Sequence, residues 1–95
     1  MLEEINFMSG DSAPITGGQI RAARAFLRWS AEELAQRSRI GVATIRRSEA
    51  VNGTPPMTAA NNLAVRRALE NAGVVFFTGA GNEPGLYFLS IAKTA

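Results

Sequence analysis

Residues 30–49, SAEELAQRSRIGVATIRRSE, decide the fold of this chain. Ser30 and Glu33 form a capping-box pattern, in which each side chain satisfies an amide group at the start of a helix. Apolar and small residues recur at helical spacing over 31–38, and after a short break the helical pattern resumes over 42–49. Two short helices joined by a turn of about three to four residues constitute a helix-turn-helix.

Further helices are predicted on both sides of this stretch. Thr16 and Gln19 repeat the capping-box pattern, which predicts a helix over 17–28. Thr58 is a helix cap by residue type, which predicts a helix over 58–72. The residues expected to face the core are Ile20, Ala23, Phe26 and Leu27 in the first of these helices and Leu63, Ala64, Arg67, Ala68 and Leu69 in the second.

The last part of the chain, 74–95, carries the pattern of a β-hairpin. Two runs rich in β-branched and aromatic residues, 74–78 and 86–91, flank the loop sequence GAGNEPG. A two-stranded hairpin is marginal in water by itself, and these runs are more apolar than one side of a small ribbon can bury. We therefore expect the hairpin to pack on the helices and on a second subunit. The predicted fold is mainly α, with four helices followed by the hairpin.

The stretch 30–49 resembles the helix-turn-helix of the Cro and phage-repressor class of transcriptional regulators. The family pattern is similar to S-Q-E-E-L-A-x-x-x-G-V-S-x-x-x-I-x-x-x-E, and the matching residues are Ser30, Glu32, Glu33, Leu34, Ala35, Ile45 and Glu49. Four positions differ from it: Ala31 replaces the usual Gln, Arg39 the turn Gly, Gly41 the Ser or Thr cap, and Ser48 a large apolar residue. The resemblance implies a repressor-like domain over 16–73, similar to small bacterial regulators of this class that end in strands.

This resemblance implies that the chain binds double-stranded DNA. In a helix-turn-helix the second helix presents base-reading residues to the major groove, while the first helix crosses the DNA backbone. The positions expected to face the groove are Val42, Ala43, Thr44, Arg46 and Arg47, with Thr44 at its edge. The positions expected at the DNA backbone are Ser30, Arg39, Gly41, Asn52 and Thr54. Arg47 is the best candidate for a bidentate contact to guanine.

The same resemblance assigns a structural role to Arg24. Members of the family often carry an arginine here that pairs with the glutamate at the position of Glu49, which ties the first helix to the recognition helix. Trp29 is interpreted as a packing anchor rather than a base-stacking platform. The loop 50–56, AVNGTPP, has two interpretations, a set of phosphate contacts or a plain connector.

The charge is placed unevenly along the chain. Although the formal net charge is +2, the stretch 17–67 contains nine arginines against three acidic residues. Arginine is the cation that binds phosphate or guanine with two parallel hydrogen bonds. A basic surface of this kind indicates nucleic-acid binding, with an ordinary solvated face as the alternative.

Composition argues against several other classes of protein. The chain has no histidine and no cysteine, so acid-base catalysis, thiol chemistry and zinc ligation lack their usual residues. We therefore expect that the protein is not an enzyme and that it binds neither a cofactor nor a metal ion. No apolar run reaches the roughly 20 residues that span a bilayer, and no signal-peptide pattern is present. A cytoplasmic, single-domain protein without a membrane partner is expected.

The N-terminal segment 1–15 is expected to be a flexible arm. It carries a small apolar group, Leu2, Ile5, Phe7 and Met8, ahead of the linker-like sequence SGDSAP. Its apolar part has three interpretations, namely a short helix, an arm that packs on a partner subunit, or a frayed terminus.

Two functional hypotheses follow from the sequence. The first is a homodimeric, sequence-specific DNA-binding transcriptional regulator, and a repressor is favoured over an activator. The alternative is an antitoxin or adaptor that uses the same fold to bind a protein partner. The apolar N-terminal segment, the apolar hairpin and the differing DNA-side positions favour it.

Overall fold

The fold is mainly helical and ends in a hairpin, as predicted. The computed structural model describes residues 13–89, and everything stated below refers to that part of the chain. Its elements are α2 (Gly17–Leu27), α3 (Ala31–Ser38), α4 (Val42–Glu49), α5 (Ala59–Asn71), β1 (Val74–Thr78) and β2 (Pro84–Phe88). The two strands pair antiparallel, with Val74 opposite Phe88 and Thr78 opposite Pro84.

Side-chain caps fix where the helices begin. At the start of α2 the predicted capping box is complete, because the Thr16 hydroxyl accepts from the Gln19 amide at 3.0 Å and the Thr16 amide donates to Gln19 Oε1 at 2.8 Å. At the start of α3 only half of the predicted box forms. Ser30 Oγ accepts from the Glu33 amide, but the Glu33 carboxylate accepts instead from Arg37 Nε, at 2.6 Å.

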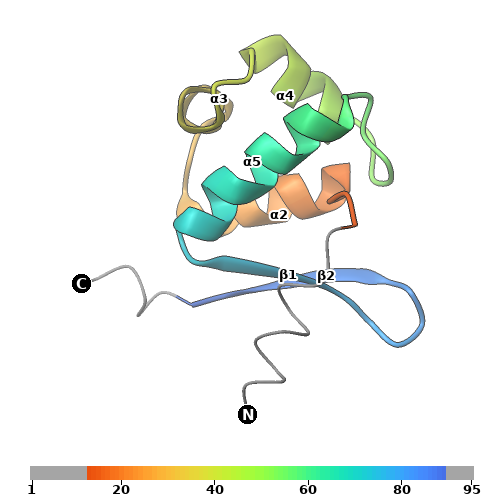
Figure 1. The fold of residues 1–95 in the computed structure, drawn as a ribbon. Coiled ribbons are helices and arrows are strands. Elements are labelled where there is room, and N and C mark those ends of the chain that lie inside the picture. The colour runs from red at the N-terminus through yellow and green to blue at the C-terminus, as the bar shows by residue number, and fades with distance from the viewer. Residues whose placement is uncertain (1–12, 90–95) are drawn as a thin grey trace.

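The elements stack in three layers (Figure 1). Helices α3 and α4 lie at one end of the molecule, α2 and α5 lie in the middle, and the hairpin lies at the other end, where β2 contacts α2 and β1 contacts α5. One hydrophobic core joins these layers. Its fully buried large side chains include Ile20, Leu34, Ile45, Leu69 and Phe76.

The predicted inner faces of α2 and α5 were wrong in part. Phe26 is exposed and stacks on Phe88 of the hairpin, with ring centroids 5.9 Å apart. In α5, Leu63 and Arg67 are exposed. The side of α5 that faces inward carries Asn62, Val65, Arg66, Ala68 and Leu69.

Polar residues face inward from α5 because they hold the chain that enters α2. The Asn62 side chain accepts from the Ile15 amide and donates to the Ile15 carbonyl, both at 2.9 Å. Arg66 Nη1 donates to the Ala13 carbonyl at 2.8 Å, and its Nε pairs with Glu70. Both polar side chains therefore have partners inside the fold, which a hydrophobicity pattern does not register.

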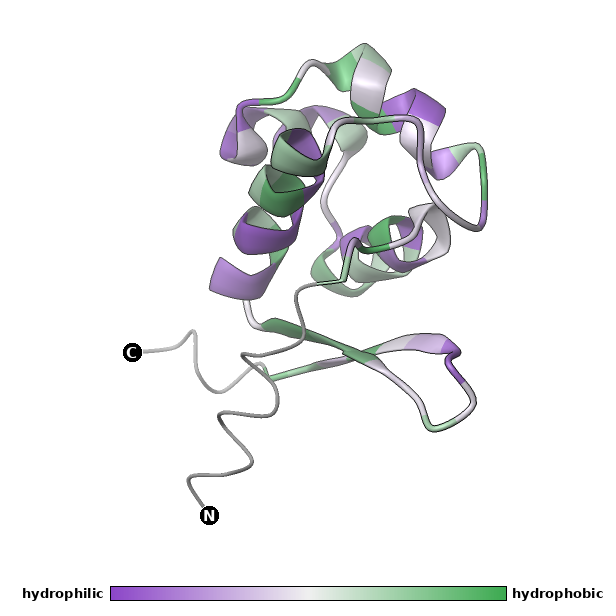
Figure 2. Ribbon diagram, turned by 45° about the vertical axis from the view of Figure 1, so that its right-hand side comes forward, coloured by the Kyte–Doolittle hydropathy of each residue, from purple (hydrophilic) through white to green (hydrophobic). Residues whose placement is uncertain are grey.

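The boundaries of the hairpin and of the N-terminal arm differ from the prediction. The second strand begins at Pro84 rather than 86, so the loop is shorter than expected. Figure 2 shows hydrophobic strands and a hydrophilic stretch near the turn. Ile15, predicted to lie in the arm, is buried in the core. Arm residues 13 and 14 are exposed, whereas residues 1–12 of the predicted arm and the expected strand end at 90–91 lie outside the described residues.

Candidate nucleic-acid interface

Helix α4 is held in place by a close approach of α2. The Gly17 amide donates to the Gly53 carbonyl at 2.8 Å, beyond the end of α4. A Cβ atom at Gly17 would lie 2.2 Å from the Ser48 carbonyl oxygen and 2.1 Å from that of Val51. Only glycine leaves room for this backbone contact. The first turn of α2 therefore rests directly on the last turn of α4.

Position 48, in the last turn of α4, carries a buried serine. Ser48 is fully buried and its hydroxyl donates to the Thr44 carbonyl at 2.8 Å, within α4. A buried hydroxyl needs such a partner. The resemblance led us to expect a large apolar residue here, and the structure instead has a buried hydroxyl that bonds within its own helix.

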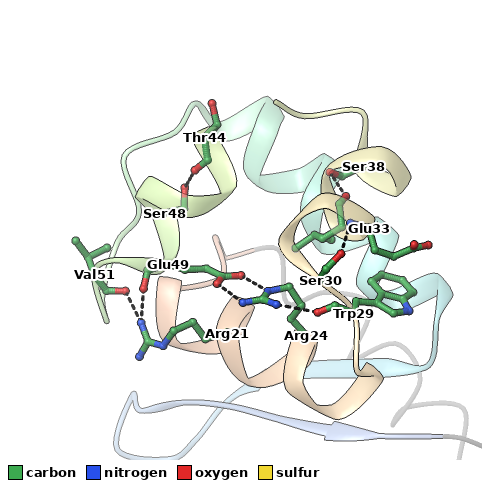
Figure 3. A network of polar contacts seen from close by, with 11 residues as sticks. Arg21, Arg24, Trp29, Ser30, Glu33, Ser38, Thr44, Ser48, Glu49 and Val51 are labelled. Carbon is green, nitrogen blue, oxygen red and sulfur yellow. Dashed lines mark hydrogen bonds and ion pairs between the residues drawn. The ribbon is translucent and has the colours of Figure 1, made fainter. Parts of the chain in front are cut away.

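Arg24 and Glu49 form the ion pair that the family resemblance implied (Figure 3). Arg24 Nε and Nη2 each donate to one carboxylate oxygen of Glu49 at 2.8 Å, and Nη1 donates to the Trp29 carbonyl, also at 2.8 Å. The hydrogen bond to Glu49 raises the pKa of Arg24 above its ordinary value, although partial burial opposes this. The guanidinium thus ties α2 to both α4 and the chain that leads into α3.

Arg21 is a further anchor of α4 that the sequence analysis did not identify. Its Nη1 donates to the carbonyls of Glu49 at 2.6 Å and Val51 at 3.2 Å, and its Nη2 donates to the Asn52 side chain. Cations at a helix C-terminus satisfy carbonyls that have no partner within the helix. Since Arg21 precedes Arg24 by three positions on the same flank of α2, this spacing was the available signal.

The five positions predicted for the major groove lie together on α4. Ala43, Arg46 and Arg47 are exposed, whereas Val42 and Thr44 are half-buried. Arg47 Nη2 donates to Thr44 Oγ1 at 3.3 Å, one turn earlier. Arg46 Nη2 donates to Glu32 of α3, which makes an ion pair across the two helices of the motif. We refer to Ala43, Thr44, Arg46 and Arg47 as the α4 face.

Four of the five candidate backbone positions lie near the two ends of α4. Arg39 ends α3 in the left-handed conformation with φ 61°, and Gly41 caps α4 without a side-chain hydrogen bond. Asn52 and Thr54 lie on the exposed loop after α4, where the Asn52 side-chain oxygen already accepts from Arg21. Ser30 belongs to a separate place, the start of α3, where its hydroxyl caps the helix.

Glu32 is the acidic residue that pairs with Arg46 of the α4 face. Its pKa is held below the ordinary value, first by the hydrogen bond to its own backbone amide at the start of α3 and then by Arg46. The carboxylate is therefore charged at neutral pH, and it compensates the charge of Arg46. Arg47 has a hydroxyl rather than a carboxylate as its recorded side-chain partner.

Comparisons with known proteins add no family assignment. No protein-family model matches the chain, and a search of curated proteins found no match. Within residues 13–89, none of the helices has the length and apolar character that crossing a membrane requires.

Proposed function

We propose that this protein is a sequence-specific DNA-binding regulator of transcription that inserts α4 into the major groove. The observation that carries the proposal is the combination of a rigidly held helix and a solvent-facing basic side. Arg24 and Arg21 hold the C-terminal end of α4, while Arg46 and Arg47 project from its other side. A positioned helix with arginines on its exposed face matches the way a helix-turn-helix reads DNA.

Residues of α4 and of the turn before it have separate roles in this proposal. Arg47 contacts guanine with two hydrogen bonds, which contributes about 1 to 3 kcal/mol of discrimination. Ala43 and the exposed part of Val42 offer apolar contact to a thymine methyl group. Thr44 lies at the edge of the groove, and Arg39 contacts phosphate from the turn before α4.

We further propose that the DNA-bound form is a homodimer. Two recognition helices about 34 Å apart read successive major grooves on one side of a palindromic site. In Figure 1 the hairpin lies at the opposite end of the molecule from α4. A dimer contact through the hairpin, which its apolar sequence led us to expect, would leave α4 uncovered.

The test is selection of bound sequences from a random DNA library, followed by electrophoretic shift of the selected site at several salt concentrations. We expect a palindromic site and salt-dependent binding. Arg47→Ala is expected to relax the sequence preference, whereas Arg39→Ala is expected to weaken all sequences alike. Failure to retard any DNA at low salt would refute the proposal.

A second candidate function, a protein-interaction module such as an antitoxin or adaptor, is favoured by the outer face of the hairpin. Val75, Phe77, Tyr87 and Leu89 form this outer hairpin face, and Tyr87 and Leu89 are 41% and 47% exposed. An exposed apolar patch is typical of an interaction site. Co-purification of a stoichiometric protein partner would support this function, and it is compatible with DNA binding through the opposite end of the molecule.

A further inference from the structure

The ion pair between Glu32 and Arg46 joins α3 and α4 on the surface that is proposed to meet DNA. The side chains of Arg46 and Glu32 are 57% and 62% exposed. Exposed ion pairs contribute little to folding stability, because water screens the attraction and two long side chains must be ordered. The effect of this pair is therefore expected in the electrostatics of the surface rather than in the stability of the fold.

The pair makes the two arginines of the α4 face unequal. A guanidinium that contacts phosphate gains affinity by releasing counterions from DNA. Arg46 is already neutralised by a carboxylate, and that carboxylate repels any phosphate that approaches it. Within residues 13–89 the side-chain partner of Arg47 is the Thr44 hydroxyl, at 3.3 Å, so no carboxylate there compensates its charge.

We propose that Glu32 is a specificity-determining positioning residue, which holds Arg46 away from sequence-independent phosphate contacts and leaves base reading to Arg47. This inference rests on the proposed DNA-binding function. The expected consequence is that removal of the Glu32 carboxylate raises the affinity for DNA of any sequence but lowers the selectivity between sequences. If Glu32 had only a structural role, its replacement would lower the affinity for DNA through misfolding or loss of a contact. A gain in affinity therefore distinguishes the proposed role from a structural one.

Glu32→Gln is the variant that tests the inference, and Glu33→Gln is its matched control. Both remove one negative charge from the first turn of α3, but Glu33 pairs with Arg37 of its own helix. For Glu32→Gln we expect the slope of log K against log salt to steepen by about 0.9, the value of one added phosphate contact. Between 200 and 50 mM salt, its affinity relative to wild type should then rise about three- to fourfold on non-specific DNA.

A double variant tests whether the gain in DNA affinity comes from Arg46. When Glu32→Gln/Arg46→Gln is compared with Arg46→Gln, the added affinity and the steeper slope should both be absent. The non-additivity of the two substitutions measures their coupling. Equal gains from Glu32→Gln and Glu33→Gln, or a gain that persists without Arg46, would overturn the inference, because net charge alone would then explain it.

A measurement without DNA separates this inference from the function on which it rests. The carboxyl carbon of Glu32 is followed by NMR during a pH titration of the wild-type protein and of Arg46→Gln. Loss of Arg46 should raise the pKa of Glu32 part of the way toward its ordinary value, because the larger contribution of the backbone amide remains. An unchanged titration shows that the pair is absent in solution and refutes the inference, while failure of wild-type protein to bind DNA refutes the proposed function as well.

Discussion

The α4 face and the outer hairpin face are the two ends of one small molecule, and they differ in how their side chains are held. The α4 face is polar, and each of its arginines has a recorded partner, Glu32 for Arg46 and Thr44 for Arg47. On the outer hairpin face, Phe77 and Tyr87 contact each other through their rings, with centroids 6.1 Å apart. One surface is suited to a charged partner and the other to an apolar one.

The middle layer, α2 and α5, supports both surfaces, and the contacts that hold one of them differ from those that hold the other. On one side Arg21 and Arg24 of α2 hold α4. On the other side the same helix contacts β2, and Gln19 Nε2 donates to the Gly85 carbonyl at 2.8 Å. Substitutions should therefore affect one end or the other according to which of these contacts they remove.

The largest effect is expected from the inner side of the hairpin. Phe76→Ala removes a fully buried ring between the hairpin and the helices, and we expect a loss of about 3 to 5 kcal/mol in the free energy of unfolding. Tyr87→Ala, on the outer face of the same hairpin, should cost less than about 1 kcal/mol. Urea unfolding of both variants measures the contrast, and similar losses would show that the outer face is part of the core.

A smaller loss is expected from the anchor of α4. Arg24→Met leaves the Glu49 carboxylate, whose side chain is 10% exposed, without its guanidinium, and this should cost about 2 kcal/mol. That is below the cost for a fully buried pair because the Arg24 side chain is 27% exposed. The double variant Arg24→Met/Glu49→Met should lose less than Arg24→Met alone, since no unpaired carboxylate remains. The opposite order in denaturant unfolding would contradict this explanation.

The smallest effect is a gain in stability that separates folding from the proposed function. Arg28 and Arg39 end α2 and α3 in nearly identical left-handed conformations, with φ 58° and 61°. Replacement of either by glycine removes the strain of the side chain in that region, and should stabilise the fold by about 0.5 to 1 kcal/mol. Only Arg39→Gly should weaken DNA binding in gel shifts. Equal DNA affinities for the two variants would remove Arg39 from the proposed interface.

The helices and their order were predictable because the signals are local. The Thr16, Ser30 and Thr58 caps act within one turn of chain, and each accepts the expected amide hydrogen bond. The Arg24 partner of Glu49 was reached through the family resemblance, since nothing local connects residues 25 positions apart. The proposed reading positions were likewise reached through that resemblance, from their place in the motif.

Only the tertiary structure decided which polar side chains bond to other elements of the fold. The contacts of Asn62, Arg66, Arg21 and the ion pair of Glu32 with Arg46 join residues that lie 14 to 53 positions apart. A hydrophobic pattern counts such residues as surface. The sequence by itself determined where helices and strands form, because caps, periodicity and turns are short-range properties. The fold determined how the arginines are used, because the partner of a long charged side chain depends on which elements pack together.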